Sequence, residues 1–242
     1  MLIVNADDFG LEKHATDNIL SCYHNGRITS TSAMVFMEDS ERAASLALDA
    51  SIRVGLHLNF TQPFNGIVKM EKLQVYHNQV MTFLKRGKYD FLLYNPLLKK
   101  QFDFIYKAQY EEFIRLYKKQ PPHIDGHHHM HLCTNMLLQN IIPRGVRVRT
   151  AFTFTKKGNI LLKRLYRRMI SYWLSKRYIC TDFLYSIEPF IQLQNQRVKR
   201  LKEIVGVSEV SSIEILVHLQ RQNEYDYLMS EEFAKIISGV ET

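Results

Sequence analysis

The chain has 242 residues, of which 46% are hydrophobic and 23% charged, a composition typical of a globular protein with a buried core. The net charge of +8 is local, because residues 156–181 hold eight basic residues and no acid, and the remaining 24 basic residues equal the 24 acids, which argues against nucleic-acid binding. No apolar run approaches the roughly 18 residues of a membrane-spanning helix, and the start lacks the charged region of a signal peptide, so we expect a cytoplasmic protein.

Hydrophobic periodicity predicts alternating strands and helices. Strands are expected over residues 1–6, 28–36, 51–60, 123–126, 146–150, 181–185 and 212–218. Helices are expected near residues 15–23, 40–48, 79–85, 102–117, 135–142, 194–205 and 231–237, with a further basic helix within 156–181. This alternation favours a parallel sheet with helices outside it. We therefore predict an α/β fold, a distorted or incomplete (β/α) TIM-like barrel, as a single domain over residues 1–242.

Polar residues follow several of these strands. Asp7 and Asp8, His57, the histidines of residues 127–131 and His218 each stand at the carboxyl end of a predicted strand, the rim where barrel enzymes assemble their sites. Adjacent carboxylates at a strand end point in different directions, so one can bind a metal while the other faces a water molecule. Each residue also has a structural interpretation, because an aspartate can cap the next helix and a lone histidine can belong to the core.

Residues 123–131 hold five of the ten histidines. By themselves they could form a surface loop without a defined role. Together with Asp8 and His57, one histidine of residues 127–131 completes a set of two imidazoles and one carboxylate, which is typical of a catalytic metal site. His218 could be a further ligand or a proton donor.

Three spaced blocks resemble a known family. Residues 5–11 (Asn-Ala-Asp-Asp-Phe-Gly-Leu), 55–61 (Gly-Leu-His-Leu-Asn-Phe-Thr) and 123–131 closely resemble the signature blocks of the YdjC-like carbohydrate deacetylases, which include chitooligosaccharide deacetylases. Ala108-Gln109 and residues 181–183 also resemble family positions. The resemblance covers the chain to about residue 237 and implies a fold similar to that of polysaccharide deacetylases.

The resemblance implies a role for each residue of the site. Asp8, His57 and His127 would hold one divalent metal ion, Asp7 would be the general base, and His218 would protonate the leaving amine. Asp125 and His129 would orient the ligands. The ligand types suit zinc, whereas family members are commonly assigned magnesium, so we expect magnesium or zinc. The implied reaction removes an N-acetyl group from an amino sugar or a chitooligosaccharide-like oligosaccharide.

The chain departs from the family pattern in two places. Residues 219–222 follow His218 directly, where the family has a proline and a loop of small residues, so we expect a shortened loop. Relatives continue into a final strand beyond the position of Thr242, so we expect truncation at the C-terminus.

Other hypotheses remain open. The chain could be a metal-dependent hydrolase of another substrate class, or a glycosidase that uses Asp7 and Asp125. It could also be a catalytically inactive protein that binds sugar or a membrane surface. Leucines and aromatic residues alternate with the basic residues of 156–181, so this segment could be an amphipathic helix that touches anionic lipid. It could equally be a helix with a solvated basic face. We also consider a homodimer.

Overall fold

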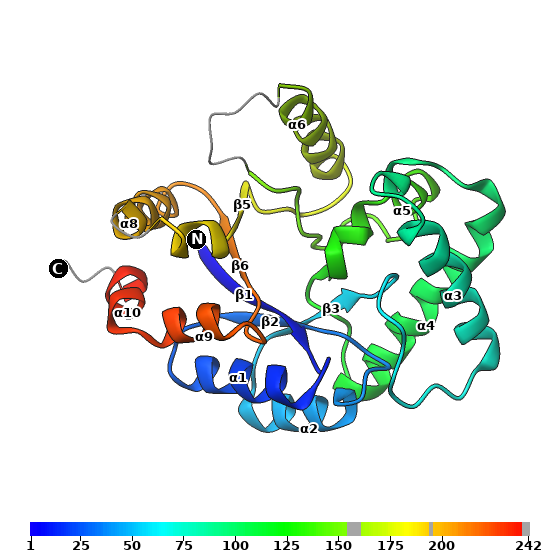
Figure 1. Ribbon diagram of the computed structural model, residues 1–242, viewed down its shortest axis with the longest axis horizontal. Helices are drawn as coiled ribbons and strands as arrows, with labels where there is room; N and C mark the ends of the chain where they lie inside the picture. The colour runs from blue at the N-terminus through cyan, green and yellow to red at the C-terminus, as the bar shows by residue number, and fades with distance from the viewer. Residues whose placement is uncertain (154–160, 194–195, 239–242) are drawn as a thin grey trace. The chain divides into compact units, whose positions relative to one another are not determined.

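The computed structural model describes residues 1–153, 161–193 and 196–238 (Figure 1). Its strands form one six-stranded sheet in the order β4-β3-β2-β1-β6-β5. They are β1 (Leu2–Phe9), β2 (Ser30–Ala33), β3 (Val54–Leu58), β4 (Ile124–Gly126), β5 (Phe183–Ser186) and β6 (Ile213–Val217). The pairs β1–β6, β5–β6 and β3–β4 are all parallel. The predicted α/β class with an incomplete barrel is confirmed.

Helices separate most of the strands along the chain, as the periodicity predicted. They are α1 (Lys13–His24), α2 (Ser40–Ala50), α3 (Glu71–Lys85), α4 (Lys99–Tyr117), α5 (Thr134–Gln139), α6 (Leu161–Ser175), α7 (Glu188–Ile191), α8 (Arg197–Val207), α9 (Gln222–Met229) and α10 (Glu231–Ser238). Short 3-10 helices are η1 (Asp90–Leu92), η2 (Pro96–Leu98) and η3 (His127–Leu132). Within the described residues, no helix combines the length and the apolar character that crossing a bilayer requires.

Several predicted boundaries were wrong. The strand expected over 146–150 is reduced to an isolated bridge between Arg147 and Ile179, and the side chain of Arg149 is buried among carboxylates that fix this segment instead of a strand ladder. The strand expected over 28–36 ends at Ala33, before the left-handed Phe36 (φ 63°). Helix α3 begins at Glu71, earlier than expected.

Parts of three predictions lie outside the described residues. These are the start of the basic segment over residues 156–160, the start of the helix expected from residue 194, and the C-terminal residues 239–242, where truncation was expected.

The chain divides into two compact units. Unit 1 comprises residues 1–7, 17–31 and 147–242, and unit 2 comprises residues 8–16 and 32–146. The two units are groups of residues that contact one another more than they contact the rest of the chain. Such a grouping does not test whether the chain is one domain, so that stays a prediction.

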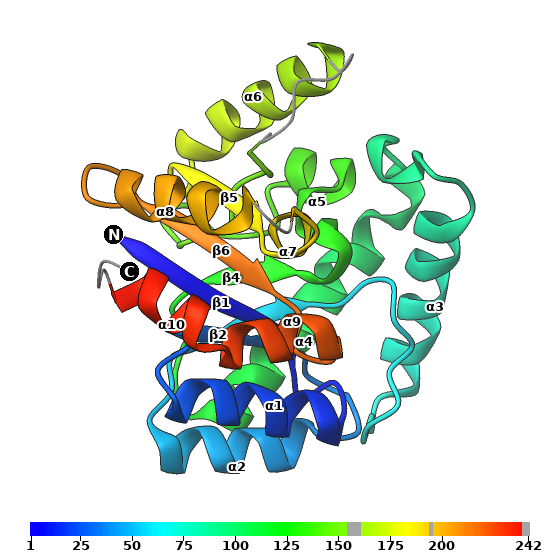
Figure 2. The same cartoon turned by 60° about the vertical axis from the view of Figure 1, so that its left-hand side comes forward.

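In unit 1, helices α8, α9 and α10 pack together beside β6 (Figure 2). Strand β6 is buried along its whole length, and the side chains of Leu201, Leu228 and Phe233 in the three helices have no exposed surface. The burial of these apolar side chains stabilises the unit around the strand that ends at His218.

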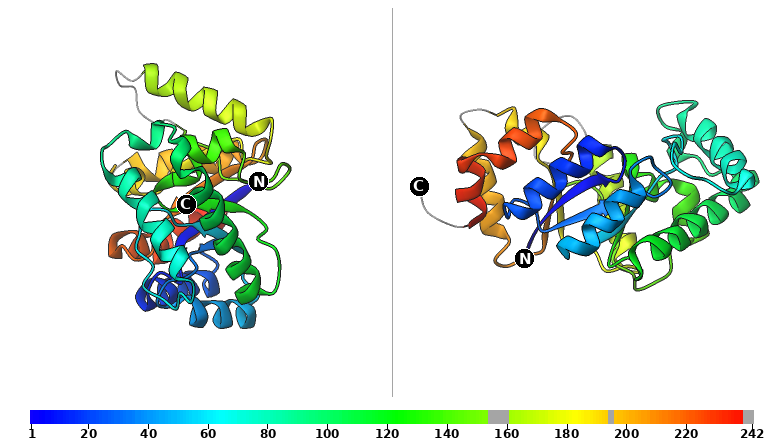
Figure 3. Two further views of the ribbon diagram at one scale, coloured as in Figure 1. Left: turned by 90° about the vertical axis from the view of Figure 1, so that its right-hand side faces the viewer. Right: turned by 90° about the horizontal axis from the view of Figure 1, so that it is seen from below.

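In unit 2, helices α3 and α4 lie side by side (Figures 1 and 3). The predicted amphipathic helix is confirmed in α4, whose Phe102, Ile105 and Phe113 are fully buried. Strand β3 is buried throughout. This core holds the carboxyl ends of β3 and β4, where the candidate site begins.

Candidate functional site

The turn at the end of β1 separates the roles of two adjacent acids. Asp8 has a left-handed backbone (φ 68°), which is unfavourable for a residue other than glycine. The turn continues through Gly10 (φ 82°), where a Cβ atom would lie 3.2 Å from the carbonyl oxygen of Met34. The Leu11 amide donates to the Asp8 carbonyl at 3.1 Å. Asp8 thus departs from strand geometry although β1 continues to Phe9, and the carboxylates of Asp7 and Asp8 reach different partners.

Unit 2 brings Asp8 together with two imidazoles. The Asp8 Oδ1 atom accepts hydrogen bonds from His57 Nε2 at 3.2 Å and from His127 Nδ1 at 2.9 Å. These three residues each offer one ligand atom, and all three atoms lie within 4.8 Å of one another. Asp8 and His57 are buried, and 12% of the His127 side chain is exposed. One side of the cluster is therefore reachable from solvent.

A second carboxylate orients His57. Strand pairing sets His57 opposite Asp125, and His57 Nδ1 lies 2.7 Å from Asp125 Oδ1. The hydroxyl of Ser32 lies 3.3 Å from the same ring nitrogen. With Nδ1 held in this way, Nε2 faces Asp8. A carboxylate behind a histidine is the usual support of a metal-binding imidazole, because it fixes the ring and the tautomer.

The cluster has the charge and donor types that a divalent cation needs. Burial alone would raise the pKa of Asp8, but hydrogen bonds from His127 and His57 outweigh it and hold that pKa well below its ordinary value. One ionised carboxylate with two imidazoles is a common donor set for zinc and other divalent metals. The residues present therefore fit a metal site.

Helix α4 fixes the backbone that follows His57. The side-chain oxygen of Gln109 accepts from the Asn59 amide at 2.7 Å, and its nitrogen donates to the Asn59 carbonyl at 3.0 Å. Both residues are fully buried. The side-chain amide of Gln109 thus pairs both backbone groups of Asn59, two residues after His57. This explains why Ala108-Gln109 stood out in the sequence.

The histidine stretch folds as the short helix η3 with two left-handed residues, His128 (φ 53°) and His129 (φ 57°). His127 enters the cluster with Asp8, whereas His128 Nδ1 lies 3.0 Å from the Thr61 hydroxyl. His131 is buried, and the His129 ring lies 6.2 Å from the His131 ring. The five histidines therefore have different surroundings, and the expected role of His129 in orienting a ligand stays a prediction.

Gly55 allows close packing beneath β3. A Cβ atom at this position would lie 2.2 Å from Nε2 of His123, so no other residue fits without moving that ring. The first residue of the second signature block is therefore needed for packing.

In unit 1, Asp7 belongs to a buried ionic network. Arg149 donates from Nη1 to Asp7 Oδ2 and from Nη2 to Asp7 Oδ1, both at 2.7 Å, and from Nε to Glu214 Oε1 at 2.6 Å. Asn5 donates to Asp7 Oδ1 at 2.9 Å, and Ser30 donates to Asn5 at 2.7 Å. All five residues are buried. A two-pronged guanidinium contact fixes both position and charge of a carboxylate.

Arg149 and Glu214 were not predicted as site residues from the sequence. Both stand in stretches that were predicted as strands, over 146–150 and 212–218. A charged side chain at a buried strand position needs a partner of opposite charge, and this was the available signal.

His218 and Asp7 follow paired positions of two neighbouring strands. Ala6 pairs with Val217 in the parallel register of β1 and β6. Asp7 follows Ala6 in β1, and His218 directly follows the end of β6. The His218 ring is half-buried, and its Nδ1 atom has no hydrogen-bond partner within the described part of the chain.

The segment after His218 is a tight turn built on a buried acid. The Arg221 amide donates to the His218 carbonyl at 3.1 Å. The Glu224 carboxylate accepts from the His218 amide at 2.7 Å and from Arg221 Nη1 at 3.0 Å. Burial raises the pKa of Glu224, and these hydrogen bonds oppose the rise. Residues 219–222, where a shortened loop was expected, therefore hold the backbone of His218 in place.

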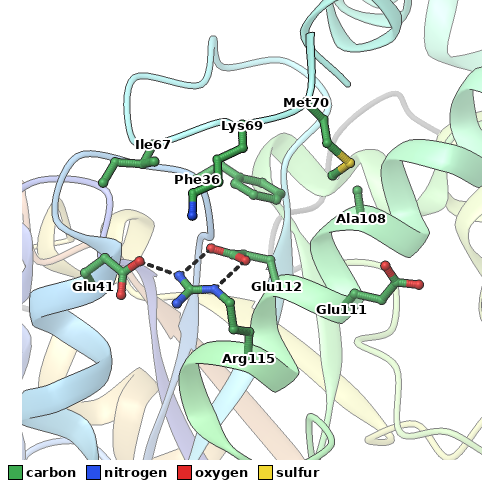
Figure 4. Close-up of a pocket in the computed structure, with 9 residues that line it drawn as sticks. All are labelled: Phe36, Glu41, Ile67, Lys69, Met70, Ala108, Glu111, Glu112 and Arg115. Atoms are coloured by element: carbon green, nitrogen blue, oxygen red, sulfur yellow. Dashed lines mark hydrogen bonds and ion pairs between the residues drawn. The ribbon is translucent and has the colours of Figure 1, made fainter. Parts of the chain in front are cut away.

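A separate cavity of about 370 Å³ lies elsewhere in unit 2 (Figure 4). Two ion pairs form its floor. Arg115 of α4 pairs with Glu112 at 2.8 Å and with Glu41 of α2. Phe36, Ile67 and Met70 line its apolar part. The cavity shares no residue with the Asp8 cluster, and its ion pairs connect α2 with α4.

Comparisons with known proteins agree on a family and a fold. The model of the YdjC-like protein family matches residues 1–239. Chitooligosaccharide deacetylases of Proteus mirabilis and Escherichia fergusonii are 35% and 33% identical over 135 residues, which are 54% of this chain and 50% of each relative. The chain thus spans about half the length of the curated relatives it matches.

One solved structure is similar over almost the whole chain. It is a "putative cellobiose-phosphate cleavage protein" from Enterococcus faecalis V583, with a TM-score of 0.64 and 18% identity over 98% of this chain and 94% of that chain. At this identity the likeness shows the fold.

Proposed function

The chain belongs to the YdjC-like protein family, and from this premise we propose that it is a metal-dependent hydrolase that removes the N-acetyl group from an amino sugar or oligosaccharide. The observation that carries the proposal is the cluster of Asp8, His57 and His127, with ligand atoms within 4.8 Å of one another. The names of the curated relatives support a chitooligosaccharide-like substrate. Its cytoplasmic location and a homodimer stay predictions.

The proposed ligands of one divalent ion, magnesium or zinc, are Asp8, His57 and His127. A bound ion supplies a Lewis acid that polarises the amide carbonyl and stabilises the negative charge that develops on its oxygen. Asp125 supports this assignment, because its hydrogen bond to His57 Nδ1 leaves Nε2 as the ligand atom.

Asp7 is the proposed general base. It would take a proton from the water that attacks the acetyl carbon. Arg149 supports this role, since its guanidinium binds both carboxylate oxygens and fixes the orientation of the Asp7 side chain.

His218 is the proposed acid. As the bond between the acetyl carbon and the nitrogen breaks, its imidazolium would donate a proton to that nitrogen, and the products are acetate and a free amine. The strand register supports a shared role with Asp7, because both residues follow the paired Ala6 and Val217. Glu224 fixes the His218 backbone for this task.

Acetate release from N-acetylated chitooligosaccharides tests the proposal. The protein is treated with chelator, and magnesium or zinc is then added back. We expect equal amounts of acetate and free amine, dependent on the added metal. In His57→Ala, stoichiometric metal and activity should both disappear, whereas the control His24→Ala changes an exposed histidine and should retain both.

Two results would contradict the proposal. Release of reducing ends without acetate would indicate a glycosidase. Metal binding without hydrolysis of any acetylated sugar would indicate a sugar-binding protein.

A further inference from the structure

Helix α6 exposes apolar side chains where a surface helix normally carries polar ones. Leu165, Met169 and Tyr172 are 64%, 58% and 65% exposed. Their spacing of four and three residues sets them on one stripe of the helix, and Leu174 on the opposite side is fully buried. Helices that only cover a core show polar side chains on the outer face. The stripe is therefore not explained by the packing of unit 1.

Basic side chains lie along the same stripe. Arg168 and Lys176 are both exposed, and the Lys176 ammonium lies 5.1 Å from the centre of the Tyr172 ring. By helical periodicity, Arg168 falls on the side of α6 that carries Leu165 and Met169. Lys176 directly follows the last residue of α6, Ser175, and its contact with the Tyr172 ring brings it to the same side. The segment 156–181 contains no acid. This face, defined by Leu165, Arg168, Met169, Tyr172 and Lys176, is named the α6 face.

Among the described residues of unit 1, helices α8, α9 and α10 leave the α6 face uncovered. Figures 1 and 2 show α6 apart from α8, α9 and α10, which pack against one another. An exposed stripe of large apolar side chains on a separate helix indicates an interaction surface.

We propose that the α6 face docks on an anionic lipid bilayer. Leu165, Met169 and Tyr172 would enter the boundary between headgroups and acyl chains, and Arg168 and Lys176 would reach the lipid phosphates. The stripe is only about 10 Å long at the rise of an α-helix, so the attachment would be peripheral and reversible. Its basic charge distinguishes the bilayer from a neutral apolar partner.

The charge also argues against a second copy of this chain on the same face. Pairing two α6 faces would bring together two segments with eight basic residues each and no acid to offset them. Such like-charge contact opposes association. An anionic bilayer, in contrast, attracts the basic side chains through its headgroups and takes up the apolar side chains at the acyl boundary. This proposal concerns where the protein binds and does not depend on the hydrolase activity.

Vesicle flotation tests the proposal with the full chain. Vesicles of phosphatidylcholine with phosphatidylglycerol are compared with vesicles of phosphatidylcholine alone, at low and physiological salt. We expect binding to the anionic vesicles that weakens with salt, and at least about tenfold weaker binding to the neutral ones.

Two variants separate the apolar and the basic contributions. The triple variant Leu165→Ser, Met169→Ser, Tyr172→Ser should weaken binding to the anionic vesicles at least about tenfold. The double variant Arg168→Gln, Lys176→Gln should weaken this binding about tenfold and reduce its salt dependence. The matched control Val210→Ser, which alters an apolar residue of unit 1 that is 88% exposed, should bind as the unchanged protein does. Circular dichroism checks that each variant is folded.

Three outcomes would overturn the proposal. They are absence of binding to either vesicle, equal binding to both vesicles, and a dimer in light scattering that the triple variant dissociates. Hydrolysis of a water-soluble chitooligosaccharide should be unchanged in the triple variant, so failure of membrane binding is distinguishable from failure of the proposed activity.

Discussion

Asp7 and Asp8 are adjacent and both buried, yet their partners differ in kind. Asp7 is held by the guanidinium of Arg149, and Asp8 by the imidazoles of His57 and His127. A guanidinium stays charged and cannot give up its proton at any ordinary pH. An imidazole can lose its N–H proton and offer the same nitrogen to a metal ion. The difference teaches that neighbouring carboxylates can be committed to separate tasks by the residues around them.

The strongest test of this contrast is Asp7→Asn. Asparagine keeps the shape of the side chain but cannot accept the proton from water, so we expect kcat for acetate release to fall about a thousandfold. Metal content, measured by elemental analysis, should not change, because Asp7 is not a proposed ligand. Loss of metal together with activity would place Asp7 among the ligands and break the contrast.

The Arg149 side of the contrast is tested by stability. Arg149→Met leaves the buried carboxylates of Asp7 and Glu214 without their shared cation, so the free energy of unfolding should fall by about 3–5 kcal/mol in denaturant titration. Arg149→Lys keeps the positive charge without the two-pronged geometry, so its free energy of unfolding should fall by less. Equal stability of all three proteins would show that the network contributes nothing.

The Asp8 side is sharpened by Asp125→Asn, which weakens the support of His57 without removing a ligand. We expect metal affinity to fall about 10–100-fold in a competitive titration, with the fold retained. Asp103→Asn is the matched control, because this carboxylate is exposed on α4 and pairs with Lys107. A metal affinity that is unchanged in Asp125→Asn would mean that the ring of His57 needs no such support.

Glu224 extends the comparison, because burial raises its pKa while imidazole partners hold the pKa of Asp8 low. For a carboxyl group with a raised pKa, the stability contributed by the neutral form is present below the ordinary value of 4.5 and is lost as the pH rises through the raised pKa. The glutamine of Glu224→Gln cannot ionise, so this variant should not lose that stability as the pH rises.

We expect Glu224→Gln to change the free energy of unfolding by about 1 kcal/mol, the smallest effect among the four substitutions predicted in this comparison. Urea titrations of both proteins at a series of pH values measure the difference between their free energies of unfolding. A difference that is constant with pH would contradict the raised pKa.

Patterns along the chain were enough for the fold class and for part of the site. Alternating periodicities predicted the strands and helices, and polar residues at strand ends pointed to Asp8 and His57. Both signals are local, because periodicity reports which residues share a face and where a buried strand stops. The three signature blocks predicted the family that the match over residues 1–239 confirms.

Only the tertiary structure decided which distant side chains meet. Spacing could not choose among the four histidines of residues 127–131, because the backbone of η3 turns through the left-handed His128 and His129. The family resemblance alone had pointed to His127. Arg149 bonds Asp7 across 142 positions of the chain, a contact that no local pattern encodes. Likewise, the composition of 156–181 allowed a solvated basic face, and the exposed Leu165, Met169 and Tyr172 follow from how α6 packs. Contacts between remote segments depend on the folded path of the chain, whereas periodicity describes each segment alone.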